Sequence, residues 1–326
     1  MNKNSKILVT GANGYIGNCL FHSLKKKFKV IGVDKETKFN NKIYKCDLLN
    51  TKKFNLILDK EKPEIIVHLA AQSLVDETIN KKKYYKNNVI ATGSLLKSMK
   101  KNKITKLIFS STAAVYQQSS KPLLEESKLK PLSTYAKNKL ICEQIIKKNK
   151  NIKSIILRFF NVCSAIDKPC IGEFHNPETH LIPTAVFKAM FNKWICIYGD
   201  DYPTPDGTCI RDYIHIKDII SAIEKSIKFL INKKKSEMFN IGNYKGLSNN
   251  QIINSIQNIM KKNINLKFVN KRKGDIPQLI CNSDKAKKLL AWQPKNSKIK
   301  KIIVDEIKWI HKLKSLGLKR RFKNYI

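Results

Sequence analysis

The chain has 326 residues, of which 42% are hydrophobic and 27% charged, a balance that excludes an extended disordered chain and indicates a globular protein. No apolar run approaches the roughly 20 residues that cross a bilayer, and no signal-peptide segment follows Met1. The eight cysteines lack Cys-x-x-Cys spacing. We therefore expect a cytoplasmic protein with free thiols, no membrane association and no metal site.

The formal charge of +39 suggests a polyanionic partner such as nucleic acid. However, lysines account for nearly all of the positive charge, and they are spread along the whole chain without interleaved aromatic residues. We favour solvated lysine-rich faces and consider a nucleic-acid partner unlikely. Only five residues are Arg, and three of these (Arg158, Arg211 and Arg272) fall in the motifs described below.

Short apolar strands alternate with helical patterns through the first half of the chain. We predict strands at Lys6–Thr10, Val30–Asp34, Ile43–Asp47, Ile65–Leu69, Lys106–Ser110 and Ile155–Phe160, and helices at Tyr15–Lys27, Lys52–Lys60, Lys83–Lys101 and Thr134–Lys148. This alternation predicts an α/β fold with a doubly wound parallel sheet. We place a Rossmann domain at 1–165 and a smaller, partly interleaved α/β substrate domain at 166–326. A strand near 238–242 would return to the first domain.

The first strand leads directly into a glycine-rich turn and then a helix. Gly11, Gly14 and Gly17 let the backbone turn sharply, approach a pyrophosphate and pack the helix on the sheet. The start of that helix offers unpaired N–H groups to phosphate. We therefore predict dinucleotide binding at this turn, with contacts from the residues between its glycines: Asn13, Tyr15 and Ile16.

Two acidic residues end the next two predicted strands. Asp34 stands where a carboxylate accepts hydrogen bonds from the adenosine ribose, which favours NAD over NADP. Lys35 beside it weakens that preference. Asp47, followed by Leu48, could meet the adenine, but a turn-initiating Asp explains Asp47 equally well.

Tyr135 and Lys139 lie at i and i+4 on one face of a helix that Ser133 or Thr134 caps. Tyr ionises near pH 10, so it can act as a base only where a positive charge favours its ionised form. Lys139 and an oxidised nicotinamide would supply that charge. We expect Tyr135 to be the general base and Thr112 to hydrogen-bond the reacting oxygen.

These features resemble the extended short-chain dehydrogenase/reductase family over nearly the whole chain. The resemblance extends to the segments Ile66–Ala71, Tyr84–Val89 and Leu107–Tyr116. It implies that Ala70 and Ala71, which follow the predicted strand at Ile65–Leu69, line the cofactor cleft and that Asn88 supports the dinucleotide. The cofactor contacts expected on this basis are Leu69, Ala70, Ala71, Asn88, Ser110, Tyr135, Lys139 and Phe159.

Sugar-nucleotide 4,6-dehydratases are the nearest rivals within this family. They carry an Asp-Glu pair directly after the catalytic Thr, which eliminates water from the sugar. Here Ala113 and Ala114 follow Thr112. Because two methyl groups cannot protonate a leaving hydroxyl, dehydration is disfavoured.

The second half resembles the UDP-glucose (UDP-galactose) 4-epimerases in particular, through Leu157–Asn161, Glu178–Pro183 and Tyr198–Asp218. This resemblance implies a UDP-sugar substrate, a retained NAD and a homodimer that packs the helices at 83–101 and 134–148. The implied substrate contacts are Thr112, Tyr135, Asn161, His180, Leu181, Tyr198, Arg211, Arg272, Asp275 and Leu279.

Individual roles follow from the same resemblance. Arg211 and Arg272 would bind the diphosphate, Tyr198 would stack on uracil and Asp275 would accept from the ribose. An ion pair of Arg211 with Asp212 or Asp218 is the structural alternative. Leu279 occupies the position that sets sugar size, and its intermediate size leaves N-acetylhexosamine substrates as an alternative. Another extended reductase, such as a pentose or uronate 4-epimerase or a sugar reductase, is a separate alternative.

Overall fold

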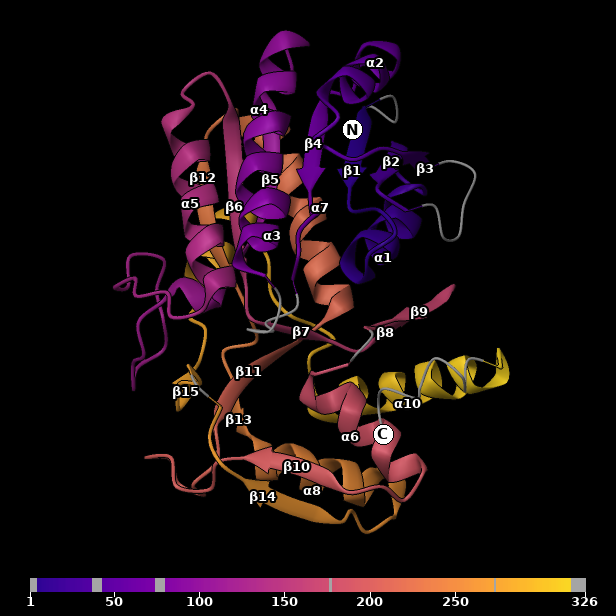
Figure 1. Ribbon diagram of the computed structural model, residues 1–326, viewed down its shortest axis with the longest axis vertical. Coiled ribbons are helices and arrows are strands. Elements are labelled where there is room, and N and C mark those ends of the chain that lie inside the picture. The colour runs from indigo at the N-terminus through magenta and orange to yellow at the C-terminus, as the bar shows by residue number, and fades with distance from the viewer. Residues whose placement is uncertain (1–4, 37–42, 74–79, 176–177, 273, 318–326) are drawn as a thin grey trace.

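The computed structural model describes residues 5–36, 43–73, 80–175, 178–272 and 274–317. It has two parts, a large parallel sheet with helices on both faces and a smaller α/β unit below the ends of its strands (Figure 1). The α/β fold with a doubly wound parallel sheet, predicted from the alternation of strands and helices, is therefore confirmed.

Seven parallel strands form the large sheet in the order β12-β6-β5-β4-β1-β2-β3. Their bounds are β1 (Lys6–Thr10), β2 (Lys29–Asp34), β3 (Ile43–Lys45), β4 (Ile65–His68), β5 (Lys106–Thr112), β6 (Lys153–Phe159) and β12 (Glu237–Ile241). The direction of winding reverses between β1 and β4, which is where such sheets bind nucleotides. The strand expected near 238–242 is β12, and it pairs with β6 at the sheet edge.

Helices bury both faces of this sheet, which explains why its strands are almost continuously apolar. One face is covered by α1 (Tyr15–Leu24), α7 (Ile216–Lys233) and α9 (Asp284–Leu290). The other face is covered by α2 (Thr51–Glu61), α4 (Ala91–Lys101) and α5 (Thr134–Lys148). Each face thus has its own hydrophobic core, and the sheet is rigid enough to position residues at its strand ends.

The helix expected at Lys83–Lys101 is divided into three segments. A short α3 (Lys81–Tyr85) and a π-helical turn η1 (Lys86–Ile90) precede α4. The wider turn frees the carbonyl of Asn88 for the hydroxyl of Thr92 (2.7 Å) and the thiol of Cys142 (3.5 Å). Such turns frequently mark functional sites. The helical pattern expected at 83–101 is therefore present, with a π turn inside it.

The smaller unit packs three helices against short strands. Its helices are α6 (Leu181–Met190), α8 (Asn249–Met260) and α10 (Ile299–Ser315), which share one core. Its strands are β7 (Asn161–Cys163), β8 (Ala165–Asp167), β9 (Cys170–Gly172), β10 (Ile195–Tyr198), β11 (Ile210–His215), β13 (Gly246–Ser248), β14 (Leu266–Val269) and β15 (Gln278–Leu279). β11 contacts β7, β13 and β15 and so ties this unit to the end of β6.

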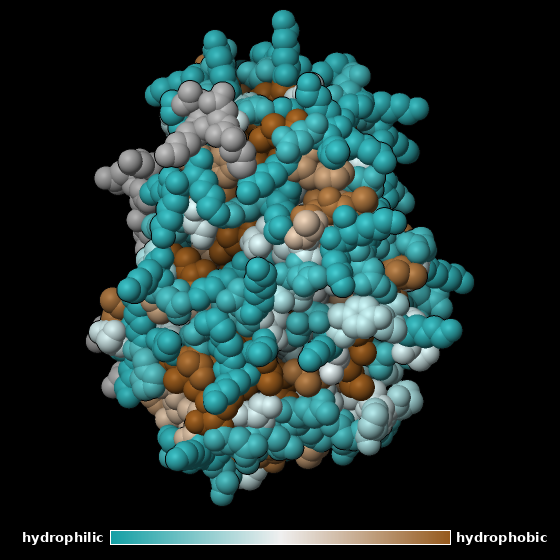
Figure 2. Space-filling model, turned by 180° about the vertical axis from the view of Figure 1, so that it is seen from behind, coloured by the Kyte–Doolittle hydropathy of each residue, from teal (hydrophilic) through white to brown (hydrophobic). Residues whose placement is uncertain are grey.

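Most of the surface is hydrophilic, with small apolar areas between charged side chains (Figure 2). Among the described residues, no helix is both long and apolar enough to span a membrane. All eight cysteines are free thiols.

Candidate active site

The glycine turn closes over the end of β1 and leaves no room for side chains. Gly11 has φ +71°, and a Cβ there would lie 2.7 Å from the backbone nitrogen of Ala70. A Cβ on Gly17 would lie 1.9 Å from the carbonyl oxygen of Gly11. The backbone of the turn therefore packs directly against the segment after β4 and against the first turn of α1.

The start of α1 is chemically suited to a pyrophosphate. Its N-cap, Gly14, has no side chain to bond the free N–H groups of the first turn. The side-chain oxygen of Asn13 is buried without a hydrogen-bond partner. The hydroxyl of Tyr15 donates to the carbonyl of Ser164 (2.5 Å), and Ile16 packs against the core, so both can offer a phosphate only their backbone. These observations fit a dinucleotide at this turn.

Asp34 ends β2 beside the turn. Its carboxylate accepts the backbone N–H groups of Asn13 (2.9 Å) and Glu36 (3.2 Å), which fix its orientation. Lys35 turns to Asp47 (3.4 Å) and to Asn87 (2.9 Å) rather than to Asp34. The lysine therefore does not neutralise the carboxylate that would repel a 2′-phosphate, which strengthens the preference for NAD.

Asp47 also accepts the backbone N–H of Leu49 (2.9 Å), so it starts a turn as the alternative interpretation supposed. Leu48, the residue that follows Asp47, is buried. One oxygen of Asp47 thus serves the turn, and the other faces Lys35 at the edge of the cleft.

Asn88 holds the segment that follows β4. Its side chain accepts the backbone N–H of Gln72 (2.7 Å) and donates to the carbonyl of Gln72 (3.2 Å). This double hydrogen bond fixes the segment that contains Leu69, Ala70 and Ala71 against the glycine turn. Asn88 therefore positions the cleft wall and is itself buried.

Three catalytic candidates meet at the end of β5. Ser133 caps α5 by accepting the N–H of Ala136 (3.1 Å), and this places Tyr135 one turn before Lys139. Tyr135 hydrogen-bonds Thr112, the last residue of β5. The ammonium of Lys139 lies 5.9 Å from the centre of the Tyr135 ring and donates to the carbonyl of Ser110 (2.7 Å).

Burial controls the acidity of this pair in the protein alone. It raises the pKa of Tyr135 well above its ordinary value, and the hydrogen bond from Thr112 only partly opposes this. Burial also lowers the pKa of Lys139 to about 8. In the protein alone, the charge of Lys139 does not offset the desolvation of Tyr135. The expectation that Lys139 and an oxidised nicotinamide together favour the ionised tyrosine stays a prediction.

The candidates for substrate contacts lie on the smaller unit, facing the same strand ends. Asn161 begins β7, His180 caps α6 and Leu181 is its first residue. Phe159, at the end of β6, is buried between the two parts. The structure thus brings the predicted segments to one side of the molecule although they are separated in sequence.

Two arginines flank Asp275. Guanidinium nitrogens of Arg211 and Arg272 lie 3.9 Å and 3.7 Å from its carboxylate oxygens. The guanidinium of Arg272 also stacks on the ring of Tyr198, 4.0 Å from its centre. The alternative ion pairs of Arg211 are not formed, since Asp212 bonds the backbone of Asn243 and Cys281. Asp218 bonds residues 295–297 instead.

Leu279 pairs with Arg211 across β15 and β11. Its side chain is buried in a cluster that includes Ala113 and Phe160. The position expected to set sugar size therefore belongs to the same apolar cluster as the residue that follows Thr112.

Sequence reasoning missed two groups of polar residues. His68, at the end of β4, is buried between the hydroxyls of Thr10 (2.8 Å) and Thr92 (3.1 Å), and burial lowers its pKa to about 3. The second group is Glu173, His175, Glu178 and His180, whose acid and imidazole groups converge before α6. Their alternation over eight residues is the signal that could have found them.

The closeness of these four side chains shifts the pKa values of both histidines. Burial lowers the pKa of His175, but the carboxylates of Glu173 and Glu178 outweigh it and raise that pKa to about 10. The same carboxylates raise the pKa of His180 above its ordinary value against the effect of burial. His180, expected to contact substrate, is thus engaged by Glu178 at 2.8 Å.

Residues 7–242 match the sequence pattern of the NAD dependent epimerase/dehydratase family. The chain belongs to this family. A UDP-glucose 4-epimerase of Lactobacillus helveticus is 37% identical over 322 residues, which cover 93% of this chain and 96% of that protein.

Solved structures of the family have the same fold. UDP-glucose 4-epimerase from Bifidobacterium longum, in complex with NAD+ and UDP, superimposes with a TM-score of 0.88 at 29% identity, covering 94% of this chain and 98% of that one. The UDP-Glc/GlcNAc 4-epimerase from Campylobacter jejuni has a TM-score of 0.80 at 31% identity, with coverages of 94% and 99%.

Proposed function

We propose that this protein is an NAD-dependent UDP-glucose 4-epimerase. The single observation that carries the proposal is the placement of Thr112, Tyr135 and Lys139 at the strand ends beside the glycine turn. Full-length similarity to curated UDP-glucose 4-epimerases supports it.

NAD fits the turn, the helix start and Asp34 described above. When bound, NAD would supply a reversible acceptor for the hydride of the sugar C4. Gly11, Gly14 and the first turn of α1 would hold its pyrophosphate, and Asp34 would bind its adenosine ribose. Because the reaction has no net redox change, the enzyme needs to retain the cofactor rather than exchange it.

Tyr135 would remove the proton of the C4 hydroxyl and later return it. Thr112, already bonded to Tyr135, would bind the reacting oxygen. Lys139, whose ammonium lies 5.9 Å from the centre of the ring, would act through its charge.

Inversion at C4 requires the sugar to present both of its faces to the same cofactor. A firm diphosphate anchor with a loosely held sugar allows this rotation. Arg211 and Arg272, both beside Asp275, are suited to the anchor because a guanidinium binds phosphate with paired hydrogen bonds. Asn161, His180 and Leu181 would add contacts from the smaller unit, and Tyr198 would pack on uracil through the ring face that Arg272 leaves free.

Conversion of UDP-galactose to UDP-glucose by the purified holoenzyme tests the proposal. We expect turnover without added NAD. Protein that carries bound NAD but converts neither sugar nucleotide would overturn it and would favour another sugar-nucleotide activity.

Sugar size is a separate question that the same assay answers. Leu279 is buried in the apolar cluster that also contains Ala113, the residue after Thr112. We propose that hexoses are the preferred substrates. Equal turnover of UDP-N-acetylglucosamine would instead place the protein with dual-substrate enzymes such as the one from Campylobacter jejuni.

We further propose a homodimer that packs α4 and α5 against a second copy. Tyr85 and Ile90, just before α4, are 46% and 47% exposed, and covering such apolar side chains favours association. Light scattering at micromolar concentration should give twice the 37.5 kDa mass of the chain. Free thiols throughout also support a cytoplasmic location.

A further inference from the structure

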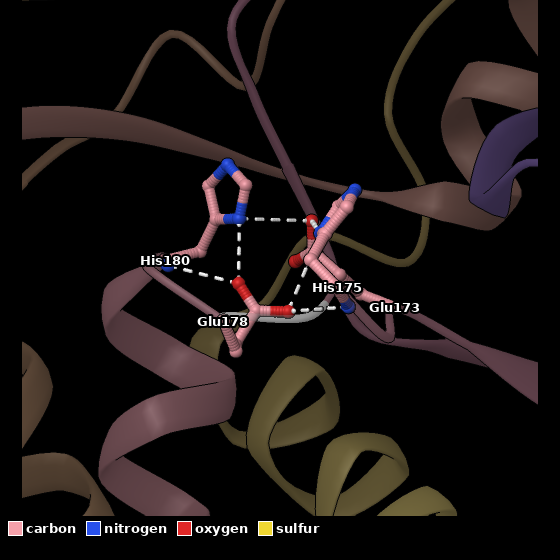
Figure 3. A group of neighbouring side chains, drawn as sticks. All are labelled: Glu173, His175, Glu178 and His180. Carbon is pink, nitrogen blue, oxygen red and sulfur yellow. Dashed lines mark hydrogen bonds and ion pairs between the residues drawn. The ribbon is translucent and has the colours of Figure 1, made fainter. Parts of the chain in front are cut away.

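Four side chains before α6 form a closed ring of nitrogen and oxygen atoms (Figure 3). The Nδ1 atom of His175 lies 3.3 Å from Glu173 and 3.3 Å from Glu178. The Nδ1 atom of His180 lies 3.1 Å from Glu173 and 2.8 Å from Glu178. All four side chains point toward one another, and each offers one atom within 4.8 Å of the others.

The ring contains a buried carboxylate oxygen that neither of its imidazoles bonds. Glu173 is 3% exposed, and one of its carboxylate oxygens has no hydrogen-bond partner. Its carboxylate is turned toward the other three side chains (Figure 3). Glu306 on α10 is fully buried, and burial together with the nearby carboxylates of Glu173 and Glu178 raises its pKa well above the usual range. Buried carboxylates without partners are costly, so this region favours a cation.

The spacing and chemistry of the ring suit zinc. Tetrahedral zinc with bonds of about 2.0–2.2 Å holds its ligand atoms about 3.3–3.6 Å apart. The closest edge of the ring would therefore open by only about half an ångström. Two imidazoles with two carboxylates are zinc ligands, whereas calcium and magnesium prefer oxygen alone. A divalent cation would also balance the two carboxylate charges.

We propose that Glu173, His175, Glu178 and His180 bind one zinc ion that fixes the segment before α6. With four protein ligands the site would be closed and therefore structural rather than catalytic. The absence of Cys-x-x-Cys spacing does not bear on it, since no ligand is a cysteine. Because His180 caps α6, the metal would also hold the start of that helix in place.

The test is metal retention by the full-length protein. The protein is stripped with a chelator, incubated with zinc alone and desalted, and its metal content is measured by mass spectrometry. We expect one zinc per chain, and a rise in melting temperature on adding zinc. Glu173→Gln and His175→Ala should both lose the bound metal and the rise.

Two matched controls separate this site from adventitious binding. His311→Ala and Cys196→Ser remove an exposed imidazole and an exposed thiol elsewhere, and both should retain one zinc. Cobalt bound to the native protein should give the strong visible absorption of a tetrahedral site, which needs no variant to fold. No retained zinc in the native protein, or equal zinc in Glu173→Gln and native protein, would overturn the proposal.

Discussion

Tyr135 is half-buried against Thr112, in surroundings that disfavour its ionised form. Replacing it with Phe removes the proton acceptor and leaves the cofactor turn untouched. We expect Tyr135→Phe to keep bound NAD and to lose turnover by about 10²–10⁴-fold. Absorbance of the bound cofactor and the rate of UDP-galactose conversion measure the two effects. Turnover near the native rate would show that another group is the base.

His68 predicts a specific sensitivity of the fold to acid. Burial holds its folded pKa near 3, below the unfolded value of about 6.5. Its contribution to stability is therefore present above pH 6.5 and is lost as the pH falls toward 3. Between pH 6.5 and 5 the loss is about 2 kcal/mol.

Urea unfolding at these two pH values checks this. His68→Gln should show a smaller difference in unfolding free energy between them than the native protein, whatever its own stability. His311→Gln, at an exposed position, serves as the matched control. An unchanged pH dependence in His68→Gln would remove His68 as the cause.

Residue identities at the site could be predicted because spacing alone places Tyr135 and Lys139 on one helix face. The pKa values of these two side chains could not be predicted from the sequence. They depend on burial and on distant neighbours, such as the carbonyl of Ser110 that accepts a hydrogen bond from Lys139. Likewise, the partner of Arg211 is Asp275, 64 positions along the chain, rather than the nearby Asp212. Side-chain partners distant in sequence leave no local pattern.

At the level of elements, the β1–α1 turn depends on glycine at position 17. A methyl group there would lie 1.9 Å from the Gly11 carbonyl, so the turn must open. We expect Gly17→Ala to lose NAD and to destabilise the protein by about 1–3 kcal/mol. Thermal unfolding and cofactor content after desalting measure both.

Gly93 in α4 provides the matched control. A Cβ there meets nothing within 4 Å. Gly93→Ala should keep NAD and gain roughly 0.5–1 kcal/mol, since alanine favours the helix. If Gly17→Ala retained NAD as well as Gly93→Ala does, the close approach of the turn would not matter for binding.

The divided helix before α4 shows what apolar periodicity misses. The pattern through 83–101 is helical throughout, and the structure is indeed helical there. Yet the π turn at Lys86–Ile90 arises from contacts of Asn88 with Gln72, Thr92 and Cys142. Thr92 is local, but Gln72 and Cys142 lie 16 and 54 positions from Asn88, and such distant partners leave no signal in the local sequence.

Across the whole molecule, basic residues far outnumber acidic ones, and the formal net charge is +39. The face shown in Figure 2 is mostly hydrophilic, and like charges at this density repel one another. We expect the free energy of unfolding in urea to rise as NaCl is increased from about 0.05 to 0.5 M, because the Debye length shortens. A fall in stability over that range would mean that surface ion pairs outweigh the repulsion.

The sheet order could be predicted in outline from the alternation of strands and helices, but its completion could not. β12 joins β6 only after the chain has passed through β7 to β11 of the smaller unit and through α7, which packs on the large sheet. Short strands such as β7, β13 and β15 carry too little sequence for periodicity to detect, although they support the arginine that we place at the diphosphate.

The return of β12 to the sheet edge also has a consequence for biosynthesis. While the ribosome is still making residues 166–236, β6 remains an open strand edge, which is prone to pairing with other chains. The seventh strand cannot join the large sheet until Ile241, the last residue of β12, has left the exit tunnel. A nascent chain that stalls within the smaller unit should therefore need chaperone protection, even though six of its seven sheet strands have already been made.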